Sequence, residues 1–147
     1  MKELTLKGFE LIKENLYFGV MTFKQYLDLI KDGIIKIPEN IDGYHRAKAT
    51  ATVYNKNKDL KSINGYNVDL FVINNNHSYI RLENNNLIIN ADSIDLLDGI
   101  FRTLIISNLD ERFMNSYLNV RIHTGTIDDA QRIVMALNNQ TGIGLDR

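Results

Sequence analysis

The chain of 147 residues contains no cysteine, no tryptophan and a single proline, and its acidic and basic side chains almost cancel. Without cysteine, disulfide bonds, thiol nucleophiles and thiolate metal sites are all excluded. The formal net charge of −1 provides no general positive field, so DNA binding would require a local basic patch. No apolar run approaches the length of a membrane span, and the charged, amphipathic start differs from a signal peptide. We therefore expect a soluble protein of the cytoplasm with no membrane partner.

The residues that are present have the composition of an ordinary globular domain, with 44% apolar and 24% charged side chains. Asparagine is abundant, with NNN at 74–76 and again at 84–86, which indicates the AT-rich genome of a low-GC bacterium or its phage. No segment has the composition of a linker. We therefore expect one compact domain over residues 1–147.

Apolar residues at helical spacing predict helices at both ends of the chain. The segment TFKQYLDLIKDG predicts a helix over 22–33, with Thr22 as its N-cap and Gly33 at its end. A similar pattern over 4–16 predicts a first helix, within an N-terminal helical extension of residues 1–20. The segment TIDDAQRIVMALNNQTG predicts a last helix with a capping box of Thr126 and Asp129. Its expected buried stripe consists of Ile127, Ala130, Ile133, Val134 and Leu137.

The middle of the chain has the β-branched residues and turn signals typical of strands. Strands are expected at 34–38, 68–73, 78–82, 87–91 and 119–124, with asparagines in the loop between the third and the fourth. Residues 47–60 fit either a helix or a strand, because their alanines favour the first and their β-branched residues the second. Intermixed helices and strands predict an α/β or α+β fold, with a mixed sheet flanked by helices.

An Asp-Gly-x-x-Arg pattern occurs twice, in IDGYHR at 41–46 and in LLDGIFRTLII at 96–106. A glycine between a strand and a helix lets backbone N–H groups approach an anion, and the helix N-terminus adds partial positive charge. An arginine three residues later can donate to two phosphate oxygens at once. The candidate phosphate- or nucleotide-binding residues are therefore Gly43, His45, Arg46, Asp98, Gly99 and Arg102.

Residues 93–108 allow two structures, and the choice decides whether the second copy is a turn. One is a strand over 94–97, a turn at Asp98-Gly99 and a helix over 100–108. The other is a single buried helix that begins at Ser93. If the two copies form one site, Arg46 and Arg102 should face a common pocket with Asp98 or Asp42 at its rim.

The order of these motifs resembles the DGQHR-domain family, which belongs to the ParB/sulfiredoxin-like superfamily and includes DNA-sulfur-modification regulators and some restriction proteins. The resemblance covers roughly residues 20–143. It rests on a Gly-x-Ile-x-x-Pro entry after a helix, a DGQHR-like turn, and a later helix with an asparagine and a nearby glutamine. The matching residues are Gly33, Ile35, Pro38, Tyr44 and Arg46 in the entry, Asp98, Gly99 and Arg102 in the turn, and Leu137, Asn138 and Gln140 in the helix.

The chain departs from the family in two respects. Ile100 and Phe101 replace the Gln-His of the turn, and these side chains can neither transfer a proton nor contact phosphate. The first copy keeps its histidine as His45, so which copy is the family's motif stays open, although the order of the downstream elements favours the second. Family members also continue well beyond the last helix, so a short natural version and a truncated chain both fit the sequence.

The resemblance implies a ParB-like domain that binds a nucleotide, or the phosphates of a nucleic acid such as DNA, in phage or bacterial DNA metabolism or defence. Its expected ligand is a nucleoside triphosphate with magnesium, with Tyr44, Asn138 and Gln140 supporting the site; no catalytic residue is assigned. His45, His77 and His123 lack metal-ligand spacing, so no metal site is expected. The competing hypothesis is a degenerate copy of the fold that binds a protein partner and has no catalytic activity.

Overall fold

The helices of the protein interrupt a run of short strands, as the intermixed sequence patterns predict. The computed structural model describes residues 3–38, 43–57, 64–75 and 77–141, except for the side chains of 138–141. Within these residues the chain forms one compact α+β unit in which helices flank a mixed sheet. The predicted fold class is therefore confirmed.

Four α-helices and one 3₁₀ turn belong to the described residues: α1 (Phe23–Lys31), α2 (Tyr44–Asn57), α4 (Ile100–Ser107), η1 (Glu111–Phe113) and α5 (Ile127–Thr141). α1 confirms its prediction, since Gln25 N donates to Thr22 Oγ1 at 3.1 Å and Thr22 N donates to Gln25 Oε1 at 2.8 Å. Of the ambiguous segment 47–60, residues 47–57 are helical and belong to α2, and the remainder lies outside the described residues. In the part of the chain that the structure describes, every helix falls short of the length and apolarity that a membrane-spanning segment requires.

α5 confirms its predicted capping box, because Thr126 N donates to Asp129 Oδ2 at 2.8 Å and Asp129 N donates to Thr126 Oγ1 at 3.3 Å. Its predicted buried stripe is correct from the second turn onward, where Leu137 is buried and Ile133 is half-buried. At Ile127 the prediction is wrong, because this side chain is 63% exposed. Helical spacing identifies one face of α5 but does not show how far along the helix that face is covered, and at Ile127 it is not.

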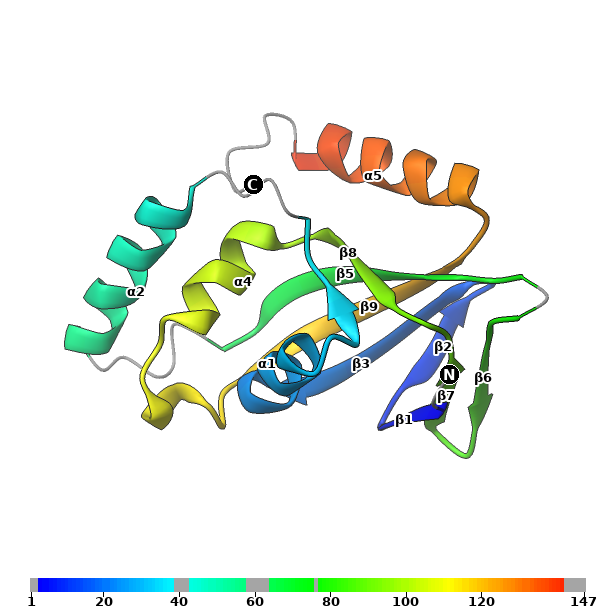
Figure 1. The fold of residues 1–147 in the computed structure, drawn as a ribbon, viewed down its shortest axis with the longest axis horizontal. Helices are drawn as coiled ribbons and strands as arrows, with labels where there is room; N and C mark the ends of the chain where they lie inside the picture. Colours follow the sequence, from blue (N-terminus) through cyan, green and yellow to red (C-terminus); the bar gives the residue numbers. More distant parts are fainter. Residues whose placement is uncertain (1–2, 39–42, 58–63, 76, 142–147) are drawn as a thin grey trace.

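The larger sheet contains six strands in the order β2-β3-β9-β5-β8-β4. Its members are β2 (Glu10–Lys13), β3 (Leu16–Thr22), β4 (Ile35–Lys36), β5 (Tyr66–Ile73), β8 (Ile94–Asp98) and β9 (Tyr117–Gly125). β5 pairs parallel with β9 and antiparallel with β8, which makes the sheet mixed. The smaller, antiparallel sheet has the order β1-β7-β6, with β1 (Glu3–Lys7), β6 (Tyr79–Glu83) and β7 (Asn86–Asn90). In Figure 1, α2 and α4 lie side by side at one end of the larger sheet, and the smaller sheet lies at the other end.

The five predicted strands are all confirmed within a few residues, as β4, β5, β6, β7 and β9. The predicted asparagine loop is the turn of the β6–β7 hairpin. Asn84 and Asn85 adopt the left-handed backbone there, with φ angles of 51° and 66°.

The predicted N-terminal helical extension is wrong, because residues 3–22 form β1, β2 and β3. In β1 the half-buried Leu4 and Leu6 alternate with exposed residues, which is the period of a strand. Gly8 and Asn15 have φ angles of 78° and 65°, and they place turns after β1 and β2. The apparent helical spacing arose from apolar residues of three separate strands, of which Ile12 is 53% exposed.

Successive side chains of β5 and β9 point to opposite sides of the larger sheet, so its two faces differ. On one face, Val68, Leu70 and Val72 join the main apolar core together with residues of α1 and α4. On the other face, Asp69 of β5 lies beside Arg121 and His123 of β9. α5 contacts β9 and β8 and covers part of this second, polar face.

Replacing Gly19 by alanine should destabilise the protein, because a Cβ at this position would overlap the ring of Phe9. Phe9 is 1% exposed and cannot move into solvent. We expect a loss of about 1–3 kcal/mol in the free energy of unfolding, the usual range for overpacking, in urea denaturation. The control is Val20→Ala, at a neighbouring side chain that is 48% exposed, where we expect a loss of about 0.5 kcal/mol or less. Equal losses for the two variants would contradict this packing.

Candidate functional site

In both copies of the Asp-Gly-x-x-Arg pattern, the glycine immediately precedes a helix. In the second copy β8 ends at Asp98, Gly99 has a φ of 105°, and α4 begins at Ile100. The predicted strand-turn-helix is therefore confirmed, and the alternative of one long helix from Ser93 is wrong. In the first copy Gly43 has a φ of 84°, α2 begins at the next residue, and Ala47 N donates to Gly43 O at 2.9 Å. Asp42 lies outside the described residues.

The two turns lie next to each other because α2 packs along α4 (Figure 1). A Cβ at Gly43 would lie 3.5 Å from Cδ1 of Phe101, the second residue of α4. The guanidinium carbon of Arg46 lies 4.4 Å from the centroid of the Phe101 ring, which is a cation–π contact. Phe101 of the second turn thus supports the arginine of the first.

Arg102 holds a different partner from Arg46, although each is the third residue after its glycine. Arg102 Nη1 donates to the backbone oxygen of Asn67 at 2.8 Å. The pairing of β5 with β8 ends at Asp69 and Asp98, so β8 does not extend to Asn67. The guanidinium group of Arg102 instead provides the hydrogen-bond donor for the Asn67 carbonyl. Nearby, burial and a hydrogen bond with Tyr54 raise the pKa of Tyr66, while the charge of Arg102 lowers it. Arg102 thus lies where α2, α4 and β5 meet.

The backbone carbonyl of Gly99 is held by two buried hydroxyl groups that are hydrogen-bonded in series. Thr103 Oγ1 donates to Gly99 O at 2.7 Å. Because that hydrogen is used, the hydroxyl of Tyr26, 2.7 Å from Thr103 Oγ1, must be the donor between these two side chains. Burial raises the pKa of Tyr26, so its hydroxyl keeps its hydrogen. The turn is therefore connected to α1 through a chain of hydrogen bonds.

The other predicted residues differ in what surrounds them. Tyr44 and His45 are exposed in the first turn of α2, with their rings edge to face at 5.7 Å. Asp98 is half-buried at the end of β8. Asn138 and Gln140 lie in α5, but their side chains are outside the described residues. All six predicted binding residues, together with Tyr44, thus lie in or beside the two neighbouring turns. The convergence of Arg46 and Arg102 on one ligand stays a prediction.

A second polar cluster, which sequence reasoning missed, lies on the polar face of the sheet. Asp69 is fully buried, and its two oxygens accept from Arg121 Nη2 and His123 Nε2, each at 2.8 Å. Burial raises the pKa of Asp69, but the hydrogen bonds from His123 and Arg121 outweigh it and hold that pKa below its usual value. The signal in the sequence was the single carboxylate within the otherwise apolar segment VDLFVI. In the structure residues 68–72 of this strand are all buried. Among the described residues no group of three or more histidine and carboxylate side chains is placed to hold a metal ion.

Comparison of the chain with models of protein families, with curated proteins and with solved structures finds no match. The resemblance to the DGQHR-domain family therefore stays a prediction.

Gly99→Ala should destabilise the fold more than Gly33→Ala, although the φ angles of the two glycines, 105° and 77°, are both positive. A Cβ at Gly99 would lie 2.9 Å from Cγ1 of the buried Val68, whereas one at Gly33 would meet open space. We expect a loss of roughly 1–2 kcal/mol for Gly33→Ala from the left-handed backbone, and roughly 1–3 kcal/mol more for Gly99→Ala from overpacking. If urea denaturation gives the same loss for both, the packing of the turn on β5 is not as described.

Asp69→Asn should lower stability at neutral pH and flatten its dependence on acid. Because the pKa of Asp69 in the folded state is below the unfolded value of about 3.9, the unfolded chain binds more protons in that range. The carboxylate's contribution is complete above the unfolded pKa and is lost as the pH falls through the folded pKa.

We therefore expect the free energy of unfolding of the wild type to fall more steeply below about pH 4 than that of Asp69→Asn, measured by urea denaturation at several pH values. Asp92→Asn, at an exposed carboxylate, is the control and should keep the wild-type slope. The same acid slope in wild type and Asp69→Asn would show that Asp69 does not titrate in this way.

Proposed function

We propose that the protein binds the phosphate groups of a nucleotide, or of a nucleic acid, where α2 and α4 begin. The observation that carries this proposal is that two glycine-capped helices begin side by side, each with an arginine three residues after its glycine. Their backbone dipoles direct two partial positive charges toward the same region. Such an arrangement favours a ligand with several negative oxygens.

Neither helix neutralises the partial positive charge of its N-terminus from within its own first turn. Neither α2 nor α4 has an acidic residue in its first turn, whereas α5 has Asp128 and Asp129 there. Gly99 also gives α4 no side-chain hydrogen bond at its N-cap. Backbone donors that lack such a cap are the ones that bind phosphate at helix N-termini. Arg46 and His45 are exposed beside them and add side-chain donors.

A nucleoside triphosphate with magnesium fits this set of groups best among phosphate ligands. A polyphosphate uses several converging donors, and the half-buried Asp98 supplies a carboxylate for the magnesium ion or its water. Phe101 at the position of the family's histidine supports binding without a proton-transfer step at that residue. The resemblance to DGQHR-domain proteins adds the setting of the proposal, which is DNA metabolism or defence in the cytoplasm of a bacterium or a phage-infected cell.

A protein-interaction module without catalysis is the second candidate, and the internal contacts of the two arginines favour it. Arg46 stacks on Phe101 and Arg102 donates to Asn67 O, so both guanidinium groups already stabilise the fold. On this alternative, the exposed Tyr44 and Val53 of α2 contact the protein partner.

Arg46→Gln should weaken nucleoside-triphosphate binding by about tenfold or more, because a hydrogen bond to a charged group contributes about 1.5–3 kcal/mol. The measurement is isothermal titration calorimetry with ATP, GTP and CTP, each with and without magnesium. Arg46 is preferred to Arg102 for this test because Arg102 also holds Asn67, so its loss would change stability as well.

Lys48→Gln removes the same charge from an exposed position of the same helix and should change the affinity by roughly twofold or less. The absence of heat with every nucleotide, together with the absence of a gel shift with single- or double-stranded DNA, would overturn phosphate binding and favour the interaction module.

A further inference from the structure

A cavity of about 380 Å³ lies on the polar face of the larger sheet, between β9, the turn of the β2–β3 hairpin and α5. Its walls include Leu16, Arg121, His123, Arg132, Ile133 and Leu137. We propose that this cavity binds a small organic carboxylate with an apolar body, and that Arg121 holds the carboxylate group. The inference is independent of the function proposed above, because the cavity and the paired turns involve different residues.

Arg121 is held in place for such a ligand by a carboxylate behind it. Its Nη2 donates to Asp69 Oδ2 at 2.8 Å, while its side chain stays 44% exposed. A guanidinium group has five N–H donors, so the bond to Asp69 fixes its orientation and leaves other donors to the cavity. The second oxygen of Asp69 fixes the ring of His123 in the same wall. Both cavity side chains are thus oriented before any ligand arrives.

The stability of the fold does not account for this cluster. Burying a carboxylate between Val68 and Leu70, both fully buried, is unfavourable unless the charge is paired. Even when it is paired, a buried ion pair is often no more stabilising than apolar side chains of similar size. Apolar residues at these positions of β5 and β9 would serve the sheet as well, but they would present no oriented cation to a cavity.

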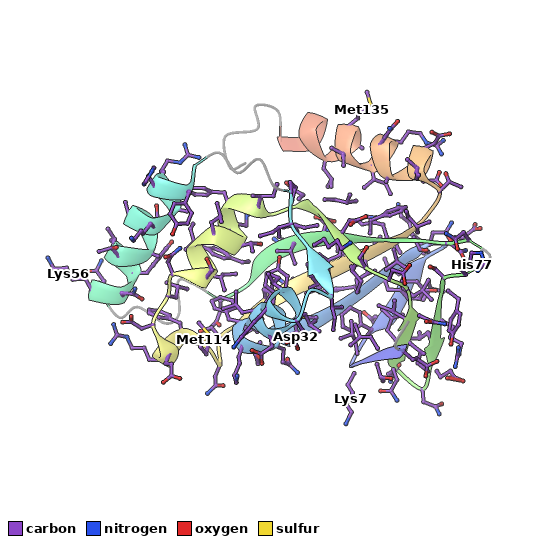
Figure 2. The ribbon with its side chains drawn as sticks, in the orientation of Figure 1. Lys7, Asp32, Lys56, His77, Met114 and Met135 are labelled. Atoms are coloured by element: carbon purple, nitrogen blue, oxygen red, sulfur yellow. The ribbon has the colours of Figure 1, made fainter. Side chains whose placement is uncertain are left out.

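The opposite wall supplies contacts for an apolar body. Ile133 and Leu137 of α5 and Leu16 of β3 line the cavity, whereas Met135 points away from the sheet (Figure 2). Asp129 also lines the cavity, but it is already bonded to Thr126 and paired with Arg132. That pairing reduces its repulsion of an anion. The volume lies at the lower end of the usual range of about 300–1,000 Å³ for small-molecule sites.

A carboxylate suits this lining better than a phosphate. One guanidinium fork matches the two oxygens of a carboxylate in a plane. A phosphate dianion would bring more negative charge against Glu14 in the lining and Asp69 behind Arg121, and it has no apolar part to contact Leu16, Ile133 and Leu137. The structure therefore favours a single negative charge attached to an aliphatic or aromatic group.

Hexanoate is a suitable probe, followed by ¹H–¹⁵N NMR titration of the intact protein. We expect shifts that saturate and centre on Leu16, Arg121, His123 and Leu137. Hexanol carries the same chain without the charge, and inorganic phosphate carries charge without the chain; each should shift these residues much less. Equal effects of hexanol and hexanoate, or shifts centred on the exposed Ile127 and Met135, would overturn the proposal.

Arg121→Gln should weaken hexanoate binding by about tenfold or more. Arg81→Gln is the matched control, because Arg81 is a strand arginine of similar exposure that pairs with Glu3 and Glu83 in the smaller sheet. It should bind hexanoate as the wild type does.

If Arg121→Gln alone does not fold because Asp69 has lost a partner, the double substitution Asp69→Asn with Arg121→Gln removes both charges and should show the same loss of binding. Wild-type affinity for hexanoate in whichever of these variants folds would overturn the assignment of Arg121.

Discussion

The parallel pairing of β5 with β9 is the constraint on which the rest of the molecule depends. Eight residue pairs join the two strands, from Tyr66 with Leu118 to Ile73 with Gly125. A slip of β5 by one residue would exchange its two faces, taking Val68 and Leu70 out of the core and Asp69 away from its partners. On its other side, the antiparallel pairing of β5 with β8 places Val68 under Gly99 and the carbonyl of Asn67 beside Arg102. Packing, the turn and the polar cluster therefore all depend on how β5 is aligned with its two neighbours.

The arginines of the two similar turns have different partners because their helices pack against different elements. α4 follows β8 directly, so the arginine of its first turn reaches the backbone of β5. α2 packs on α4, and Arg46 reaches the ring of Phe101 instead. An exposed cation–π contact contributes about 0.5–1 kcal/mol, less than the stabilisation that a phosphate ligand would offer. Arg46 is thus the donor that a ligand can recruit at little loss to the fold, whereas Arg102 is tied to the sheet.

Local chemistry predicted more of the molecule than apolar spacing did. The Thr22 and Thr126 caps, the asparagine hairpin and the glycine turn before α4 follow from hydrogen bonds or backbone angles within a few residues. The prediction of an N-terminal helix failed because apolar residues of three strands happened to fall at helical intervals. The cluster of Asp69 with Arg121 and His123 could not be found, because a separation of more than 50 residues is closed only by the parallel register. The closeness of the two turns likewise depends on helix packing rather than on either motif.

A net charge near zero does not argue against local anion sites in this protein, because of where its arginines find their partners. Arg81, Arg112 and Arg132 pair with nearby carboxylates, so their charges are largely neutralised. Arg46 instead rests on an aromatic ring, which orients the guanidinium without cancelling its positive charge. Arg121 lies between these cases, since its carboxylate partner is buried behind it and its exposed side faces the cavity. The total charge of the chain counts all arginines equally, whereas the fold leaves only some of them able to attract an anion.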